Sequence, residues 1–551
     1  MNKRGYIISL FCLLLSVLTN AQTTISETIE FDVEIEIDSA NRNYSPARES
    51  TTIEKNPKKQ TYSFSDYRIG LEKLKPRVPI YTIQPPKLPP LSYGFAKVGF
   101  GNYVSPFAEA LITNRKNTKN YRYGVYAKHF SSKNGPVDEE NSGISENTFQ
   151  LFGDYFKKDL IFSGRGIYQR RGYRFYGYPD TLEGIEVDDI KRVYNQINLS
   201  GAAKKVNEKA DFVFDTEIGF NHLSDNYDVS ETGLNLSLQG EYRLDYHNRI
   251  ILESNNYFGN IKDSLNNRGR TVIGLKPYYS YFKKESRVQL RGGFNLVVEN
   301  DTLAGAGTTH FYPMLLVDVT LVKPPGFRVY AGIDGDIERN TWNELSMENP
   351  FIAPVFVLNH TNRTLSMFGG VKATILKRFT FDAGMQFNTY ENLFFYVNDS
   401  SNVAQFDVIY DAGTTTHLNL YGEVIYTYGK KSKLGMRLET NSYNTSSIET
   451  AYHRPNFTAN FMGTHQFTER ISAGADIYIQ SGIRGLRYEN GVGEEVKLDA
   501  IIDFSLRGEY KLNQRFGAWT EANNLFGKEY QQFLQYPNKG ANFLIGLNYI
   551  F

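Results

Sequence analysis

The chain has 551 residues, of which 41% are hydrophobic, 22% charged and 14% aromatic, and its formal net charge is +1, which argues against non-specific nucleic-acid binding. The single cysteine, Cys12, excludes a disulfide framework and a cysteine-based zinc site. The only long apolar run lies at the start of the chain, which excludes a helical membrane bundle.

Residues 1–21 have the pattern of an export signal. Lys3 and Arg4 precede a short apolar run over residues 6–18, and Ala21 offers a small residue for cleavage before Gln22. The apolar run is too short to span a bilayer, so a transmembrane anchor fits poorly. Removal of this segment changes the net charge from +1 to −1 and leaves no cysteine.

Residues 22–91 form a proline-rich segment, with 8 of the 19 prolines of the chain. Its last part, residues 85–90, reads Pro-Pro-Lys-Leu-Pro-Pro and is typical of a stiff polyproline linker. Such a composition does not build a core. We expect the segment to lie in the periplasm or in the lumen of the domain that follows.

One run inside this segment alternates strictly between apolar and acidic residues. The apolar positions of residues 29–38 are Ile29, Phe31, Val33, Ile35 and Ile37. The pattern predicts a strand that pairs with a partner protein or inserts into the chain's own lumen. An acidic disordered tail is the other interpretation, and the sequence leaves both open.

From residue 92 to residue 551 the hydrophobic period is two. Uninterrupted alternation covers residues 211–221, 234–245, 288–298, 418–428 and 496–511. The runs are longer than the five or six residues that are usual for soluble strands, and Phe and Tyr gather near their ends. Both features favour a transmembrane barrel over a soluble sandwich.

The connections between these runs alternate between short turns and long polar loops, which is the signature of a transmembrane barrel. Counting strands between them gives 22, and an even count places both ends of the domain on the periplasmic side. The sequence therefore predicts an all-β fold: a transmembrane antiparallel barrel of about 22 strands over residues 92–551.

The last strand carries an apolar stripe that ends on a terminal aromatic residue. The stripe consists of Phe543, Ile545, Leu547, Tyr549 and Phe551. It resembles the signal read by the barrel-assembly machinery of Gram-negative outer membranes. We therefore predict contacts with that machinery during biogenesis and with outer-membrane lipid afterwards.

The same region resembles the closing strands of TonB-dependent receptors. The resemblance rests on an Asn-Leu-Phe turn at residues 524–526, on Tyr536-Pro537 and on the aromatic strand of residues 542–551. It implies a 22-stranded barrel and transport across the outer membrane. The Gln22 start and the strands rich in Tyr and Asn are similar in style to proteins of the Bacteroidetes phylum.

Members of that family carry a plug domain of well over a hundred residues, whereas 70 residues lie between positions 22 and 91. We therefore expect a barrel without that plug, and large barrels need occlusion. The N-terminal segment is the expected blocking element. Inward-folded loops such as residues 340–363, or a partner protein, are the alternatives.

Motifs for chemistry are sparse, so we expect no enzyme and no cofactor. No HExxH, G-x-S-x-G or GxxxxGK[ST] pattern occurs. His417, beside Asn419 and Glu423, is the least ordinary candidate for a barrel hydrolase. Acidic loops at residues 138–140 and 183–189 have ligands suited to calcium, but such clusters are more often a solvated surface.

Two functional classes remain from the sequence. The first is a receptor-like transporter. The second is a non-transporting subunit of an outer-membrane assembly, secretion or surface-lipoprotein complex, with a periplasmic or outer-membrane protein partner. Charged residues of both signs on the expected lumen face, such as Arg291 and Asp215, do not predict strong ion selectivity.

Overall fold

The computed structural model describes residues 92–551 except 115–119, 180, 183, 208, 283–286, 302–306, 323–325 and 490. The described residues belong to one compact unit. The predicted export signal, the proline-rich segment and the alternating run at residues 29–38 lie outside the described residues. Among the described residues, no helix has the length and hydropathy needed to cross a bilayer.

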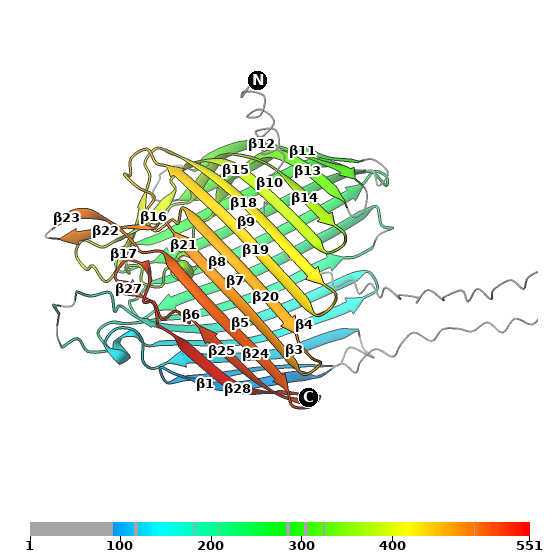
Figure 1. Cartoon of the computed structure of the whole chain (residues 1–551). Coiled ribbons are helices and arrows are strands. Elements are labelled where there is room, and N and C mark those ends of the chain that lie inside the picture. Colours follow the sequence, from blue (N-terminus) through cyan, green and yellow to red (C-terminus); the bar gives the residue numbers. More distant parts are fainter. Residues whose placement is uncertain are drawn as a thin grey trace, which may run out of the picture. The chain divides into compact units, whose positions relative to one another are not determined.

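The described chain folds into one closed antiparallel sheet of 22 strands (Figure 1). Each barrel strand pairs with the next barrel strand along the chain, and β1 pairs with β28 to close the ring. The predicted class and strand number are confirmed. The first half of the barrel consists of β1 (Gly94–Gly101), β2 (Ser105–Thr113), β3 (Tyr121–Ser132), β4 (Ile144–Lys157), β5 (Leu160–Arg174), β6 (Lys191–Lys205), β7 (Phe212–Asp225), β8 (Ser230–Arg243), β9 (Asn248–Lys262), β10 (Asn267–Phe282) and β11 (Val288–Asp301).

The second half of the barrel consists of β12 (Thr308–Val322), β13 (Phe327–Glu338), β14 (Thr361–Ile375), β15 (Phe379–Glu391), β18 (Thr414–Tyr428), β19 (Ser432–Asn444), β20 (Phe457–Gln466), β21 (Ile471–Ser481), β24 (Ile501–Lys511), β25 (Phe516–Asn523) and β28 (Asn542–Ile550). The loops add the hairpins β16 (Phe394–Asn398) with β17 (Phe406–Tyr410), β22 (Arg484–Glu489) with β23 (Val492–Lys497), and β26 (Gln531–Phe533) with β27 (Tyr536–Pro537). Two short helices complete the set, η1 (Glu139–Ser142) and α2 (Trp342–Glu348).

The outer face of the barrel is apolar, as a lipid-facing surface requires. In β28, Phe543, Ile545 and Leu547 are exposed on this face, while Tyr549 stacks between Phe516 and Phe551. The structure thus places the predicted stripe on the outside of the closing strand. A closed barrel with such a band is an outer-membrane protein, with long loops outside the cell and short turns in the periplasm.

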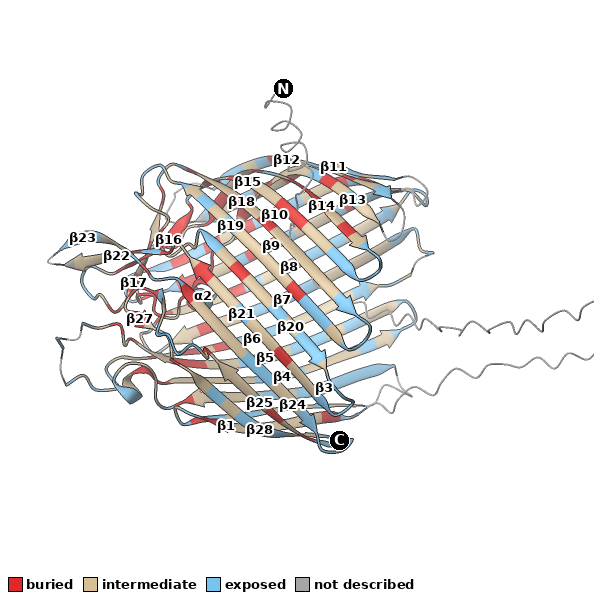
Figure 2. Cartoon of the chain, viewed as in Figure 1, coloured by how far each residue is buried: buried red, intermediate tan, exposed pale blue. Residues whose placement is uncertain are grey.

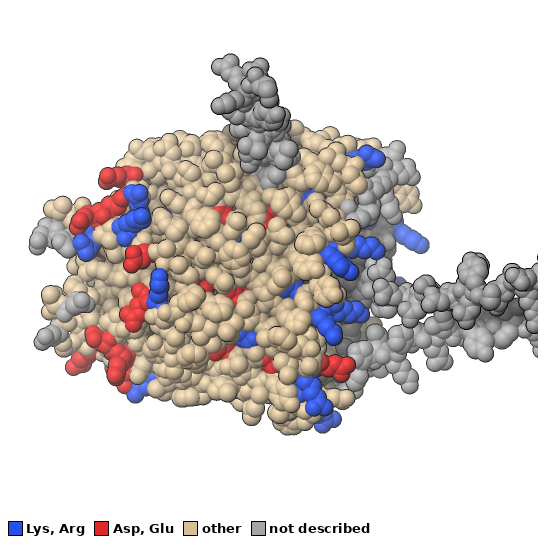
Figure 3. All heavy atoms as spheres, viewed as in Figure 1, with Lys and Arg blue, Asp and Glu red and all other residues tan. Residues whose placement is uncertain are grey.

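The charged residues of the barrel gather at its two ends. On the face drawn in Figure 3, Asp and Glu are concentrated at the end with the long loops, where Lys and Arg also lie, and Lys and Arg predominate at the end with the short turns. A band of mostly uncharged residues lies between them. This distribution fits a wall that spans the membrane between two aqueous surfaces.

The seam between β1 and β28 is covered on the inside by Trp519 of β25. A side chain at Gly99 or at Gly546 would meet the Trp519 ring at 2.5 and 2.6 Å, so only glycine lets the indole lie flat across the seam. The ring also contacts Phe107 edge-on, with 5.4 Å between centroids, and the Lys97 ammonium at 3.8 Å. Glycine here therefore serves close packing across the closure of the barrel.

We expect Trp519→Ala to lower the free energy of unfolding by about 3 kcal/mol, because it leaves a cavity over two glycines that no neighbour can fill. The measurement is urea-induced unfolding in detergent, followed by heat-modifiable mobility on gels. Trp519→Phe keeps a ring over the seam and serves as the matched control. Equal losses in both variants would contradict the seam argument.

The structure corrects one predicted strand. Residues 496–511 were expected to form a single alternating run, but β23 ends at Lys497 and β24 begins at Ile501. Leu498 turns inward, donates its amide to the Ile483 carbonyl oxygen at 3.0 Å and packs with Ile501 and Leu534. Burial of Leu498 in a loop core outweighs continuation of the strand.

Candidate functional site: an extracellular cap and a periplasmic recess

Four extracellular loops fold together at the outer end of the barrel, and we name them the cap. They are residues 339–360, 392–413, 445–456 and 524–541. Apolar side chains of the first, second and fourth of these loops join the upper ends of β5–β9 in one buried cluster, whose members include Trp342, Leu345, Phe351, Ile352, Phe406, Phe533 and Tyr536. Figure 2 shows buried positions gathered around α2, β17 and β27.

Helix α2 forms because residues 341–344 carry a complete capping box. The Thr341 hydroxyl accepts from the Glu344 amide, and the Glu344 carboxylate accepts from the Thr341 amide. The amides of Trp342 and Asn343 then donate to Glu231 of β8 at 3.3 and 3.0 Å. A fully buried carboxylate on the inner wall thus holds the start of the helix.

An ion pair with no solvent exposure lies beneath this loop. The Arg192 guanidinium of β6 stands 2.5 Å from the Asp225 carboxylate of β7, and both side chains are 0% exposed. The rings of Tyr194 and Tyr227 each lie 5.0 Å from the guanidinium carbon. Arg192 also donates to the carbonyl oxygen of Ile352 at 3.2 Å, so the pair fixes the loop as well as the wall.

Other wall side chains hold the carbonyl groups of the same loop. Arg171 of β5 donates to the Ser346 carbonyl oxygen at 3.2 Å, and the Tyr194 hydroxyl to that of Pro350 at 2.8 Å. Arg270 of β10 donates to the Asn340 carbonyl oxygen at 2.6 Å. Since the loop starts on β13 and reaches the walls of β5–β10, it crosses the mouth of the barrel.

The remaining cap loops are fastened to this one. Phe351 stacks on Tyr536 with 3.6 Å between ring centroids, and the Tyr536 hydroxyl donates to the Ala404 carbonyl oxygen. The backbones of Phe351 and Phe406 are joined by a 3.0 Å hydrogen bond. The loop of residues 340–363, one of the elements considered for occlusion, therefore folds inward as part of a larger body.

Asp411 joins the cap loop of residues 445–456 to the loop of residues 392–413. Its carboxylate accepts from the amides of Ser446 and Ser447 at 2.9 and 2.7 Å and from the hydroxyls of Ser447 and Thr415 at 2.6 and 2.5 Å. Burial alone would raise the pKa of Asp411, but these four bonds outweigh it and lower the pKa to about 2. The tie is therefore ionised at every physiological pH.

Two histidines of the cap are held in the neutral form. His453 donates from Nδ1 to the Tyr396 carbonyl oxygen at 2.8 Å and accepts at Nε2 from the Leu534 amide at 3.2 Å. His360 accepts at Nδ1 from Arg270 at 3.0 Å and from the Asn340 amide at 3.2 Å. Burial lowers the pKa of His453 to about 4 and that of His360 to about 2.

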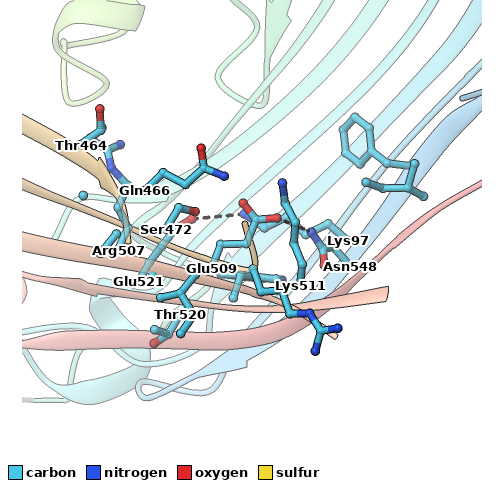
Figure 4. A pocket seen from close by; sticks show the side chains of 18 of the residues that line it. Lys97, Thr464, Gln466, Ser472, Arg507, Glu509, Lys511, Thr520, Glu521 and Asn548 are labelled. Atoms are coloured by element: carbon cyan, nitrogen blue, oxygen red, sulfur yellow. Dashed lines mark hydrogen bonds and ion pairs between the residues drawn. The ribbon is translucent and has the colours of Figure 1, made fainter. Parts of the chain in front are cut away.

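The other end of the barrel is hollowed on its inner wall. A recess of about 860 Å³ lies beside the seam and reaches the periplasmic turns at Lys430, Lys431 and Arg470. Figure 4 shows Lys97 and Glu521 facing each other there, and the ammonium and carboxylate are 3.2 Å apart. The wall of the recess therefore carries an ion pair, and the lining residues that come from the turns are mainly cations.

The predicted lumen residues face inward, but they do not assemble a reactive centre. His417 donates from Nε2 to the Asn441 side-chain oxygen at 2.9 Å and stacks on Tyr443 with 4.2 Å between ring centroids, so it belongs to a row of hydrogen-bonded polar side chains. Within the described ranges, no group of three His, Cys, Asp or Glu residues has the geometry of a metal site. Of the acidic loop residues, Glu140 pairs with Lys133 and Asp188 with Lys191.

Sequence reasoning did not identify the residues that hold the cap together and fasten it to the barrel wall, namely Arg192, Asp225, Glu231, His360 and His453. Two signals were available. The capping box at residues 341–344 marks a helix inside a predicted loop. Apolar runs at residues 351–353 and 394–397 are unusual for a solvated loop and indicate a second core.

No family model matches the chain, and no curated protein matches its sequence. Solved structures share its fold. The FrpB iron transporter from Neisseria meningitidis matches with a TM-score of 0.66 at 11% identity, covering 84% of this chain and 82% of that chain. The siderophore receptor PirA from Acinetobacter baumannii matches with a TM-score of 0.63 at 8% identity, covering 84% of this chain and 81% of that chain.

The ferric-catecholate import receptor Fiu from K12 E. coli gives a TM-score of 0.62 at 10% identity, covering 84% of this chain and 82% of that chain. These neighbours are TonB-dependent receptors, so the architecture that the C-terminal resemblance implied is confirmed. Identities this low show the shared fold alone.

Proposed function

We propose that the protein is a receptor-like transporter of the outer membrane. The observation that carries this proposal is the cap itself, which crosses a wide lumen and is held to the wall by separate polar contacts. Contacts of that kind can be released one by one without unfolding the barrel. The outer-membrane transporters and receptors among the structural neighbours support the same function.

A solute-flux assay tests the proposal without knowledge of the substrate. Full-length protein is reconstituted into liposomes, and swelling is followed with the pentose arabinose and with a larger trisaccharide as probes. We expect slow but measurable entry of the pentose and exclusion of the trisaccharide, because the cap opens only transiently. Absence of any flux, even with the cap excised and residues 22–91 deleted, would contradict a transport function.

The second candidate is a non-transporting subunit of an assembly, secretion or surface-lipoprotein complex. It is favoured by the cationic rim at the periplasmic turns, including Lys430, Lys431 and Lys511, which suits an acidic protein partner. Purification from native outer membranes with quantitative mass spectrometry tests it. Stoichiometric partners that are lost on deletion of residues 22–91 would establish this candidate and would give that segment its role.

We further propose that residues 22–91 act in the periplasm or the lumen, through Ile29, Phe31, Val33, Ile35 and Ile37 where they pair with a partner. The export signal and the C-terminal stripe would deliver the chain to the barrel-assembly machinery. Removal of Phe551 is expected to reduce the amount of protein in the outer membrane, which quantitative blotting of membrane fractions measures. An unchanged amount would argue against an assembly signal.

A further inference from the structure

The two neutral histidines of the cap stand at joints between different elements. His453 belongs to the loop of residues 445–456 and joins β16 to residue 534 of the last loop. His360 closes the loop that carries α2 and joins it to the barrel wall at Arg270. Each nitrogen lone pair points at a donor, so an added proton has no acceptor in either place.

Among the residues that the structure describes, no carboxylate is hydrogen-bonded to the His453 ring. The rings of Phe406 and Phe533 pack at 5.3 and 5.6 Å between centroids, and its own amide donates to the Arg484 carbonyl oxygen. Arg454, next in the chain, is a cation that disfavours a proton on His453, and it pairs with Glu348 at 3.4 Å. An imidazolium at this joint would meet the Leu534 amide and the field of Arg454.

The surroundings of His360 are more strongly opposed to a proton. Arg270 and Arg339 are the cations that face it, and both disfavour its charged form. A proton on Nδ1 would also displace the hydrogen bond from the Asn340 amide, the residue just before the capping box. Protonation of His360 would therefore break the contact that positions α2.

We propose that the cap is a proton-operated gate, in which acidification of the medium outside the cell protonates His360 and His453 and releases the cap from the barrel wall. The opening itself is a property of the cap, whereas its use for passage of a solute rests on the proposed transport function. The gate and the transport function are therefore measured separately.

The sign follows from proton binding. The pKa of each histidine in the closed cap lies below its ordinary value of about 6.5, so the closed cap binds fewer protons than the open one. The contribution of each histidine to closure is full above pH 6.5 and declines as the pH falls below it. At pH 5 each lowers the closed-to-open ratio by about 30-fold.

Asp407 of β17 acts in the opposite sense. Burial, and then the neighbouring Asp399 carboxylate, raise its pKa to about 6, so the closed cap gains protons there as the pH falls below 6. At pH 5 the protonation of Asp407 raises the closed-to-open ratio about tenfold and so offsets part of the effect of the histidines. The pKa of Asp411 is too low for that group to contribute in this range. Glu231 of β8, whose carboxylate is buried beneath the start of α2, acts in the same sense as Asp407. The net expectation is a closed-to-open ratio that is lower at pH 5 than at pH 7.5, by at most about 100-fold.

The test is thiol labelling of a buried cap position in the full-length chain after export. Ala404 is 5% exposed and lies in the cap cluster, and the chain beyond residue 21 has no cysteine of its own. In Ala404→Cys, the labelling rate by 4,4′-dithiodipyridine, relative to the same thiol in urea, reports the open fraction even when that fraction is small. We expect it to rise between pH 7.5 and pH 5, by at most about 100-fold.

The decisive variant carries His360→Asn and His453→Asn together. The Asn amide can accept at the first joint and donate at the second, and Asn tolerates the positive φ of His453. It does not titrate, so the labelling rate should no longer rise in acid. His247→Asn, in an exposed periplasmic turn, is the matched control and should keep the full response.

Three outcomes are informative. An equal response in the double variant, or no response in the unmodified cap, would overturn the gate. Faster labelling in acid that vanishes in the double variant would establish it. If arabinose flux then fails to follow the labelling rate, the gate stands and the transport function falls.

Discussion

Excision of the α2 loop is expected to turn the protein into an open pore. Replacement of residues 342–358 by a short Gly-Ser linker removes the element that crosses the mouth, together with its bonds to Arg171, Arg192 and Tyr194. Barrels of this size leave an aqueous channel when nothing fills them. We expect single-channel conductance in planar bilayers to rise by about tenfold or more.

The matched control shortens a loop that is not part of the crossing. Removal of residues 488–493 from the β22–β23 hairpin leaves the cap cluster intact. Conductance should stay at the level of the unmodified protein. If the α2 excision also leaves conductance low, the lumen is blocked elsewhere, and the same excision combined with deletion of residues 22–91 identifies the N-terminal segment as the block.

Much of the barrel could be predicted from the sequence, because the alternation of lipid-facing and lumen-facing residues depends only on neighbouring positions. Alternation along β28, for example, follows from one face meeting lipid and the other the lumen, and the lengths of the connections give the strand count. The C-terminal stripe could be placed on the outer face for the same reason. No information beyond neighbouring residues is needed for either inference.

The cap could not be predicted in the same way, because its contacts join distant parts of the chain. Arg192 donates to the carbonyl of Ile352, 160 residues later, and Tyr536 meets Ala404 across 132 residues. Which loops meet depends on the order of strands around a closed ring and on loop shape. The apolar run at residues 394–397 indicates that a core exists, but not which partners complete it.

Loss of the buried Arg192 charge is expected to open the cap by the largest margin of any single substitution. Arg192→Met keeps most of the side-chain volume but leaves the Asp225 carboxylate buried without its cation. Breaking a buried pair on one side costs about 3–5 kcal/mol. The closed-to-open ratio, measured by labelling of Ala404→Cys, should fall by about two to four orders of magnitude.

Two further variants separate the buried charge from the loss of contacts. Asp225→Asn added to Arg192→Met removes the orphaned charge, so it should restore most of the closed population. Arg454→Met breaks a partly exposed pair with Glu348 in the same cap and should cost less than about 1 kcal/mol. If both arginine variants open the cap equally, general damage to the loops, and not burial of the ion pair, accounts for the effect. A large difference between them would mean that the cap is held at the wall of β6 and β7, where the loop from β13 completes its crossing of the lumen.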